Sequence, residues 1–242
     1  MSENSGNDLH TPTELTEPLS GDSVSETPDT VPDVRLRPSV AASPGHKVLI
    51  TGPGRSGTTF LVNLLTLLGL DTGFSDRLTE IDPLSFAGLE QGIFVRPHYK
   101  SPFTPNYILK IPNVFSSLQA ALRREDFVLD HAYIAIRDLE SVVRSRARVD
   151  NLNPSGWGGF TGEDGEDGER RRASEGLYHL MALLAEHDLP FTILSFPRIT
   201  TDPEYLFEKL EFLVRGILKH EFIAAFHRCS RPELVHDFSR AD

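Results

Sequence analysis

The chain has 242 residues, a formal net charge of −11 and an ordinary 39% share of hydrophobic residues. Its single cysteine, Cys229, excludes a disulfide framework and a cysteine-rich metal site. The acidic balance argues against a nucleic-acid partner. The N-terminus has no basic, apolar leader and no run approaches the roughly 20 apolar residues of a membrane span, so a cytoplasmic protein is expected.

Residues 1–45 are rich in Ser, Thr, Pro, Asp and Glu and contain no aromatic residue. Such a composition cannot bury enough apolar surface to offset the entropy of ordering, so it predicts a disordered tail. Much of the negative charge is local, because residues 1–46 contain eight acidic residues and only two arginines. The remaining residues, 46–242, are expected to form one domain whose charge does not exclude an anionic cofactor.

From Lys47 onward, predicted strands alternate with predicted helices. The expected strands cover 47–51, 106–111, 131–136 and 190–195. The expected helices cover 59–68, 114–124, 139–149, 173–187, 203–218 and 220–228. This alternation indicates a three-layer α/β/α domain with a central parallel sheet, in which ligands gather at the carboxyl ends of the strands. Residues 71–105 and 150–172 are expected to be irregular, and the acidic run 162–169 to be a solvated loop neutralised by the arginines that follow it.

The strongest motif spans residues 47–61, KVLITGPGRSGTTFL, where a strand enters a glycine-bearing loop that opens into an apolar helix. Such a loop turns backbone N–H groups toward one point at the positive end of the helix dipole, which favours a phosphate or sulfate. The spacing from Gly52 to Gly57 is that of a P-loop, but Thr58 stands where an ATP-binding P-loop carries lysine. The motif predicts an anion site that lacks the usual ATP lysine.

A second motif follows the third expected strand, in the segment AYIAIRDLESVVRS. Arg137 ends the strand, and Ser145 lies about two turns along the next helix. A planar guanidinium suits two-pronged recognition of a phosphate, and a hydroxyl adds a further donor. Taken alone, a strand-ending arginine is a weak signal.

Together the two motifs resemble the sulfotransferases that use 3′-phosphoadenosine 5′-phosphosulfate (PAPS). Their 5′-phosphosulfate loop reads Lys or Arg followed by Ser-Gly-Thr-Thr, as in Arg55 to Thr59, and their 3′-phosphate motif has an arginine with a serine eight positions later. The resemblance spans about residues 47–215 and looks most like the small bacterial type. It implies a P-loop nucleotide-binding fold that transfers a sulfuryl group from PAPS to a hydroxyl or amine acceptor, a small molecule or glycan-like, without a metal.

The resemblance also implies roles for individual residues. Arg55 and Lys110 would stabilise charge on the transferring group, and Arg137 and Ser145 would grip the 3′-phosphate. The loop would hold the 5′-phosphosulfate through six residues: Gly54, Arg55, Ser56, Gly57, Thr58 and Thr59. Many members have a histidine soon after the lysine as the catalytic base, but here Ile111 and Pro112 follow. Glu90 is the preferred base in its place.

Several alternatives stay open from the sequence. His98 is the second candidate base. A P-loop kinase or other ATP-dependent phosphotransferase would need a lysine at position 58 and a strand-end aspartate for magnesium, for which only Asp138 is near. A non-catalytic protein that binds PAPS or its product adenosine 3′,5′-bisphosphate (PAP) is the other competitor. The acceptor and the oligomeric state are not encoded in any motif.

Overall fold

The computed structural model describes residues 45–75, 81–82, 85–95, 102–152, 159–160, 162 and 164–232. The chain divides into the units Met1–Val34 and Arg35–Asp242, and every described residue belongs to the second unit. The predicted tail, residues 1–45, therefore lies outside the described residues except for Gly45.

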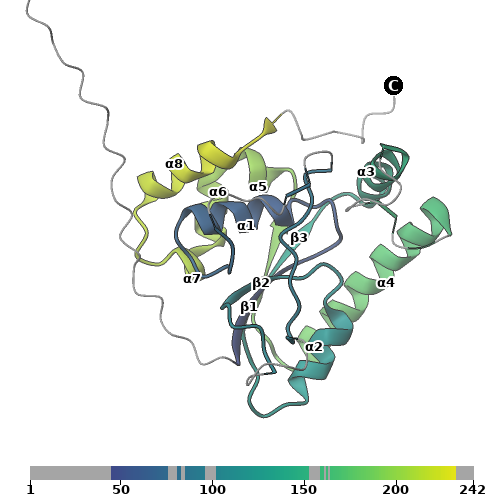
Figure 1. Ribbon diagram of the computed structural model, residues 1–242, viewed down its shortest axis with the longest axis horizontal. Helices are drawn as coiled ribbons and strands as arrows, with labels where there is room; N and C mark the ends of the chain where they lie inside the picture. The colour runs from purple at the N-terminus through teal and green to yellow at the C-terminus, as the bar shows by residue number, and fades with distance from the viewer. Residues whose placement is uncertain are drawn as a thin grey trace, which may run out of the picture. The chain divides into compact units, whose positions relative to one another are not determined.

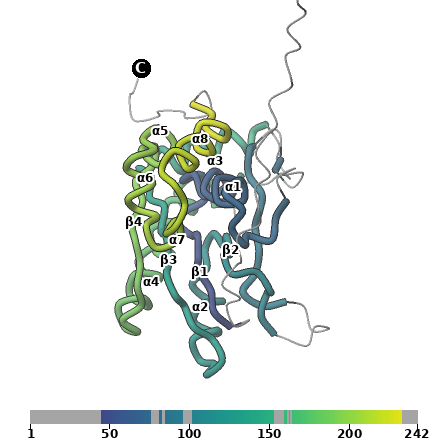
Figure 2. The backbone as a smooth tube through the Cα atoms, turned by 90° about the vertical axis from the view of Figure 1, so that its left-hand side faces the viewer, coloured from purple at the N-terminus to yellow at the C-terminus, as the bar shows by residue number. Residues whose placement is uncertain are grey.

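Four strands form one parallel sheet, as the alternation of elements predicts. They are β1 (His46–Thr51), β2 (Ile108–Lys110), β3 (Val128–Ile136) and β4 (Phe191–Ser195). Their order across the sheet is β2-β1-β3-β4, which can be followed from right to left in Figure 2. The chain leaves β1 toward one edge to form β2 and then crosses back over β1 to form β3. The carboxyl ends of β1 and β3 thus flank a topological switch point, where α/β proteins bind ligands.

Helices cover both faces of the sheet, with α1 and α8 over one face and α2 and α4 over the other (Figure 1). The first three helices are α1 (Thr58–Leu67), α2 (Phe115–Leu122) and α3 (Leu139–Leu152). The others are α4 (Gly165–Glu186), α5 (Arg198–Thr201), α6 (Pro203–Lys209), α7 (Glu211–Val214) and α8 (Lys219–Cys229). The described residues form an α/β fold with a parallel sheet flanked by helices. None of their helices combines the length and apolar character needed to cross a bilayer.

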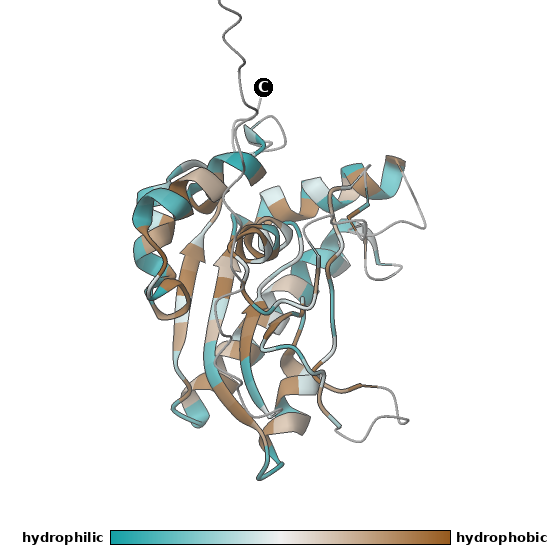
Figure 3. Cartoon of the chain, turned by 60° about the vertical axis from the view of Figure 1, so that its left-hand side comes forward, coloured by the Kyte–Doolittle hydropathy of each residue, from teal (hydrophilic) through white to brown (hydrophobic). Residues whose placement is uncertain are grey.

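Two apolar cores explain why the helices pack on both faces. Along β1, Val48 and Ile50 point into the core beneath α1 and α8, whereas Leu49 points into the core beneath α2 and α4. Tyr133 and Ile134 on β3 alternate in the same way. Strands buried on both faces read as continuous apolar runs, and Figure 3 shows such brown stretches along the strands.

Two sequence predictions were wrong. The segment 150–172 is not a loop throughout, because α3 extends to Leu152 and α4 begins at Gly165. The acidic run 162–169 therefore includes the first turn of α4, and Glu169 is buried rather than solvated. The arginines after it do pair with it, since Arg170 binds Asp167 and Arg172 binds Glu169.

The predicted helix 203–218 is also interrupted. The chain forms α6 and α7 with a break at Leu210, and the helical backbone ends at Val214. Gly216 then adopts a positive φ of 85°, a left-handed conformation that commonly follows a helix end. The apolar periodicity held because Leu206, Leu210 and Val214 all reach the same core.

Candidate functional site

A cavity of about 480 Å³ opens at the carboxyl ends of β1, β2 and β3. The loop before α1, the loop after β2 and the strand-end Arg137 all contribute to its wall, at the sheet edge where the sequence predicts that ligands gather. Among the described residues, its charged lining consists of Arg55, Lys110, Arg137, Arg146, Arg231 and Glu90. These five basic side chains against one acidic side chain favour an anionic ligand, although the chain as a whole is acidic.

The loop between β1 and α1 has the backbone of an anion-binding turn. Arg55 and Gly57 both have positive φ values, 70° and 84°, and Gly57 is the N-cap of α1. Gly57 makes no side-chain cap, so the first-turn N–H groups of α1, beginning at Thr58, are not satisfied by a capping side chain. The buried Ser56 hydroxyl has no hydrogen-bond partner among the described residues. This geometry provides N–H and O–H donors for an anion.

Arg55 links this loop to α3 and to the 85–90 segment, which borders the cavity. Its Nε donates to the Ser145 hydroxyl at 3.1 Å, and its Nη1 donates to the Ser85 carbonyl at 2.5 Å. Burial, together with the nearby charges of Arg137 and Arg146, lowers the pKa of Arg55 to about 10. An anion in the cavity would relieve this crowding of positive charge.

Arg137 lies at the end of β3 and points back to the loop. Its Nη1 donates to the Arg55 carbonyl at 3.1 Å, and its guanidinium lies over the Phe196 ring, 4.7 Å from the centroid. The hydrogen bond holds the loop in its turn, and the ring restricts the plane of the guanidinium. Arg137, Ser145 and Arg55 therefore form one connected group, although they come from three separate parts of the chain.

Lys110 ends β2 and is 1% exposed. Its Nζ donates to the Thr59 hydroxyl at 2.9 Å and to the Gly88 carbonyl at 2.5 Å, and lies 3.4 Å from Oε1 of Glu90. Burial lowers the pKa of Lys110, while the Glu90 carboxylate opposes that shift. The arrangement places a cation, a hydroxyl and a partly exposed carboxylate at one point of the cavity wall.

The 85–90 segment has a constrained backbone. Phe86 and Leu89 both have positive φ values, 51° and 58°, which are uncommon for residues with bulky side chains. Gly88 pairs with Ile81 in an isolated antiparallel bridge, and Thr59 reaches the Gly88 carbonyl as Lys110 does. Conformations of this kind concentrate at binding sites and persist where surrounding contacts enforce them.

Arg146 is a cavity residue that the sequence reasoning missed. It is 5% exposed, its Nη1 donates to the Gly159 carbonyl at 2.7 Å, and its Nε lies 2.9 Å from Oε1 of Glu169 on α4. Its burial could have been predicted from the sequence, because Val142, Arg146 and Val149 follow helical spacing on one buried face of α3. A basic residue on such a face needs a buried partner.

Most predicted site residues meet in this cavity. Its lining includes Gly54, Arg55, Gly57, Thr58, Thr59, Glu90, Lys110, Arg137 and Ser145. Ser56 is fully buried and does not line it. His98, the second candidate base, lies outside the described residues. Cys229 lines the cavity, but burial raises the pKa of its thiol to about 12, which disfavours the reactive thiolate.

No model of a known protein family matches this chain, and the searches of curated proteins and of solved structures likewise returned no match.

Proposed function

We propose that this protein is a sulfotransferase that uses PAPS as the sulfuryl donor and a small hydroxyl or amine compound as the acceptor. One observation carries the proposal: Arg55, Lys110, Arg137 and Ser145 line a single cavity with the loop that precedes α1. These residues come from β2, β3, α3 and the loop, and they are the ones that the resemblance assigns to the two anionic groups of the donor.

The chemistry of the cavity fits such a donor. The wall offers guanidinium and ammonium groups, threonine hydroxyls and the start of a helix, all of which bind phosphate or sulfate oxygens.

Bound PAPS would supply a sulfuryl group whose S–O bond to the 5′-phosphate breaks as the acceptor oxygen or nitrogen attacks sulfur, leaving PAP. Arg55 and Lys110 would neutralise the negative charge that grows on the leaving phosphate oxygen. Thr59 would hold Lys110 in place through the 2.9 Å hydrogen bond. Arg137 and Ser145 would fix the distant 3′-phosphate, so that binding energy is used for alignment.

Glu90 would take the proton released by the acceptor. Its side chain is 32% exposed and lines the cavity, so an acceptor can approach it. It also lies 3.4 Å from Nζ of Lys110, so the proton acceptor and this cation would both lie next to the transferred group. The acceptor proton would pass to this carboxylate as the new bond to sulfur forms.

Two observations speak against the ATP-dependent alternative. Thr58 occupies the position of the P-loop lysine, and its side chain is 4% exposed at the start of α1. Asp138, the carboxylate two residues after the end of β3, accepts a hydrogen bond from the Ser141 N–H on Oδ1 at 2.8 Å. That contact caps α3 and uses one oxygen of the carboxylate that a magnesium site would require.

Two measurements test the proposal. Calorimetry with PAP and with ATP separates the nucleotide classes: we expect PAP to bind and ATP to bind far more weakly, and tight ATP binding without PAP binding would overturn the proposal. Transfer of label from [³⁵S]PAPS to an acceptor pool tests catalysis. Binding of PAP with no transfer to any hydroxyl or amine acceptor would favour the non-catalytic binding protein.

A further inference from the structure

We infer that Arg146 binds the anionic ligand of this cavity directly through Nη2, and that Glu169 is the positioning residue that aims it. This inference rests on the function proposed above and adds a third arginine that no motif assigned. The ligand contact would lie at Gly54, at the start of the loop. The chemical class bound is a phosphate or sulfate ester group of the donor.

The contacts of Arg146 fix two sides of its guanidinium. Nη1 donates to the Gly159 carbonyl, and Nε faces the Glu169 carboxylate. The remaining nitrogen, Nη2, lies against Gly54, since a Cβ built there would be only 2.2 Å from it. Gly54 and Arg146 both line the cavity, so Nη2 meets the loop at the cavity wall. A side chain at position 54 would separate the guanidinium from the loop.

Glu169 is well placed to hold this orientation. It is 2% exposed and projects from α4 toward α3, where Arg146 is 5% exposed. A buried guanidinium with one fixed carboxylate has little rotational freedom, so its third edge keeps a constant direction. The backbone carbonyl of Gly159 adds a second fixed point.

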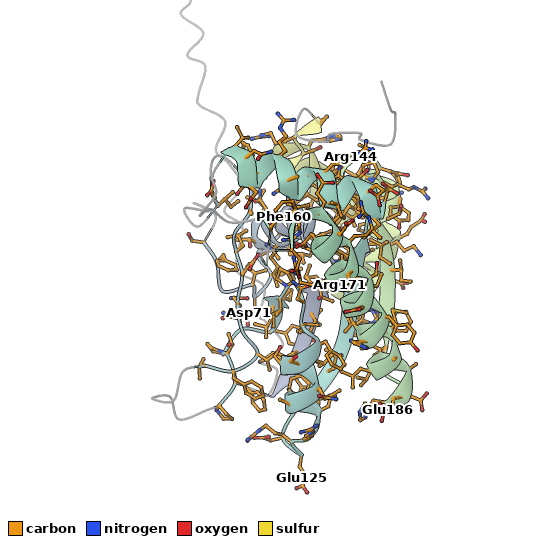
Figure 4. All side chains as sticks on the ribbon, turned by 90° about the vertical axis from the view of Figure 1, so that its right-hand side faces the viewer. Asp71, Glu125, Arg144, Phe160, Arg171 and Glu186 are labelled. Atoms are coloured by element: carbon orange, nitrogen blue, oxygen red, sulfur yellow. The ribbon has the colours of Figure 1, made fainter. Side chains whose placement is uncertain are left out.

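A purely structural role explains these contacts less well. Helices α3 and α4 are already joined by an exposed ion pair, in which Arg170 donates two hydrogen bonds of 2.7 and 2.8 Å to Glu140. Burying a second ion pair brings a large desolvation penalty, so such a pair is weak grounds for stability alone. Figure 4 views α3 and α4 from outside, with Arg144 and Arg171 labelled on the two helices. Arg146 is buried, whereas those two are exposed.

Electrostatics point in the same direction. Arg146 is close enough to Arg55 to lower the pKa of Arg55, and Arg137 acts on Arg55 in the same way. The guanidinium of Arg55 is thus repelled by two others near the loop. A buried ion pair that served only to stabilise the fold would gain nothing from repulsion between arginines. A multiply charged anion bound near Arg55, Arg137 and Arg146 would instead attract all three.

The test is the affinity of the full chain for PAP, measured by calorimetry, together with the Tm of each variant without ligand. Arg146→Met keeps an unbranched apolar stem but removes the charged guanidinium, and it should weaken PAP binding about ten- to one-hundredfold. Arg146→Lys keeps the charge without the fork and should lose less. Should Arg146→Met fail to fold, Arg146→Lys and Glu169→Gln carry the test.

In the Glu169→Gln variant, the direction of the change in PAP affinity distinguishes a positioning role from a simple charge effect. Removal of a negative charge near the cavity would by itself strengthen anion binding. Loss of the fixed orientation of the Arg146 guanidinium would weaken anion binding. We expect weaker binding, and we expect this loss to vanish in the Arg146→Met background because the two residues act as one unit. Unchanged or tighter binding in Glu169→Gln would overturn the positioning role.

Glu140→Gln is the matched control, because it breaks the outer ion pair between the same two helices with the same change of charge. It should leave PAP affinity within about twofold, as expected for an exposed pair outside the cavity. If Arg146→Met and Arg146→Lys bind PAP as the unsubstituted protein does, the inference alone is overturned. If the unsubstituted protein does not bind PAP, the proposed function is overturned and this inference with it.

Discussion

Arg55 donates a hydrogen bond from Nε to the Ser145 hydroxyl at 3.1 Å, joining the loop before α1 to a helix 90 positions away in the sequence. The contact connects the two motifs that the sequence presents separately. Because Arg137 also donates to the Arg55 carbonyl, both ends of the second motif reach the same loop residue. Ligand groups bound at the loop and at α3 would therefore share one network of charged side chains.

Replacing Ser145 with alanine should weaken PAP binding by about 1 kcal/mol, roughly fivefold, through loss of one hydrogen-bonding hydroxyl. Calorimetry gives the affinity, and thermal melting reports on folding. Ser174→Ala is the control, since Ser174 lies exposed on α4 and bonds only to the Arg170 carbonyl within its own helix. Equal affinity in both variants would contradict a role for Ser145 in the cavity.

Replacing Gly54 with alanine should reduce both stability and PAP affinity. The new Cβ would lie 2.2 Å from Nη2 of Arg146, so the guanidinium or the loop must move. Such overpacking typically costs about 1–3 kcal/mol. A helical glycine supplies the control: a Cβ at Gly176 would be 3.9 Å from the Asn113 side chain, and Gly176→Ala should be neutral or slightly stabilising. A fully stable Gly54→Ala variant with normal affinity would contradict the close approach.

The affinity for PAP should fall at high pH. Burial and neighbouring arginines lower the pKa of Arg55 to about 10 in the free protein. A bound anion would raise the pKa of Arg55 again. Binding is therefore linked to proton uptake, and log Kd should rise with pH above about 10, with a slope approaching about one per titrating group. The lowered pKa of Lys110 adds a second group that shifts in the same direction.

Calorimetry between pH 7 and the highest pH at which circular dichroism shows a folded chain would measure this slope. Arg55→Gln should bind more weakly at neutral pH and show a smaller slope, because one of the titrating groups is gone. A pH-independent Kd in the unsubstituted protein would show that these cations do not contact the ligand.

Replacing Glu90 with glutamine should lower kcat for sulfuryl transfer by about 10²–10⁴ if this carboxylate is the catalytic base. PAP affinity should not fall, because the change removes a negative charge that lies beside Lys110 and acts on Arg146 in the cavity wall. Glu175→Gln, at an exposed position on α4, controls for the loss of one negative charge. Retention of full turnover in Glu90→Gln would assign the proton to another group.

The local parts of this structure could be predicted from the sequence. The turn that contains Gly57 is encoded by residues next to one another, and the strand that ends at Arg137 is marked by an apolar run. Parallel pairing then brings the two segments together at the same edge of the sheet. The cavity around Arg55, Lys110 and Arg137 follows from these local patterns and one topological rule.

The parts that depend on distant partners could not be predicted. The first two turns of α4 are polar, and they are held by ion pairs such as Arg170 with Glu140 on α3. No periodicity within residues 165–172 reveals that partner. The Arg146–Glu169 pair was missed for the same reason, because its formation requires α4 to begin before Glu169.

Arg55 donates a hydrogen bond to the Ser85 carbonyl, and Lys110 donates one to the Gly88 carbonyl. These two backbone carbonyls therefore compete with an anionic ligand for the same cationic side chains. A ligand that took over these donors would exchange with two carbonyls of one short segment. Such an exchange would favour an anion with several oxygens that spans both cations over a monatomic halide, which cannot span the two.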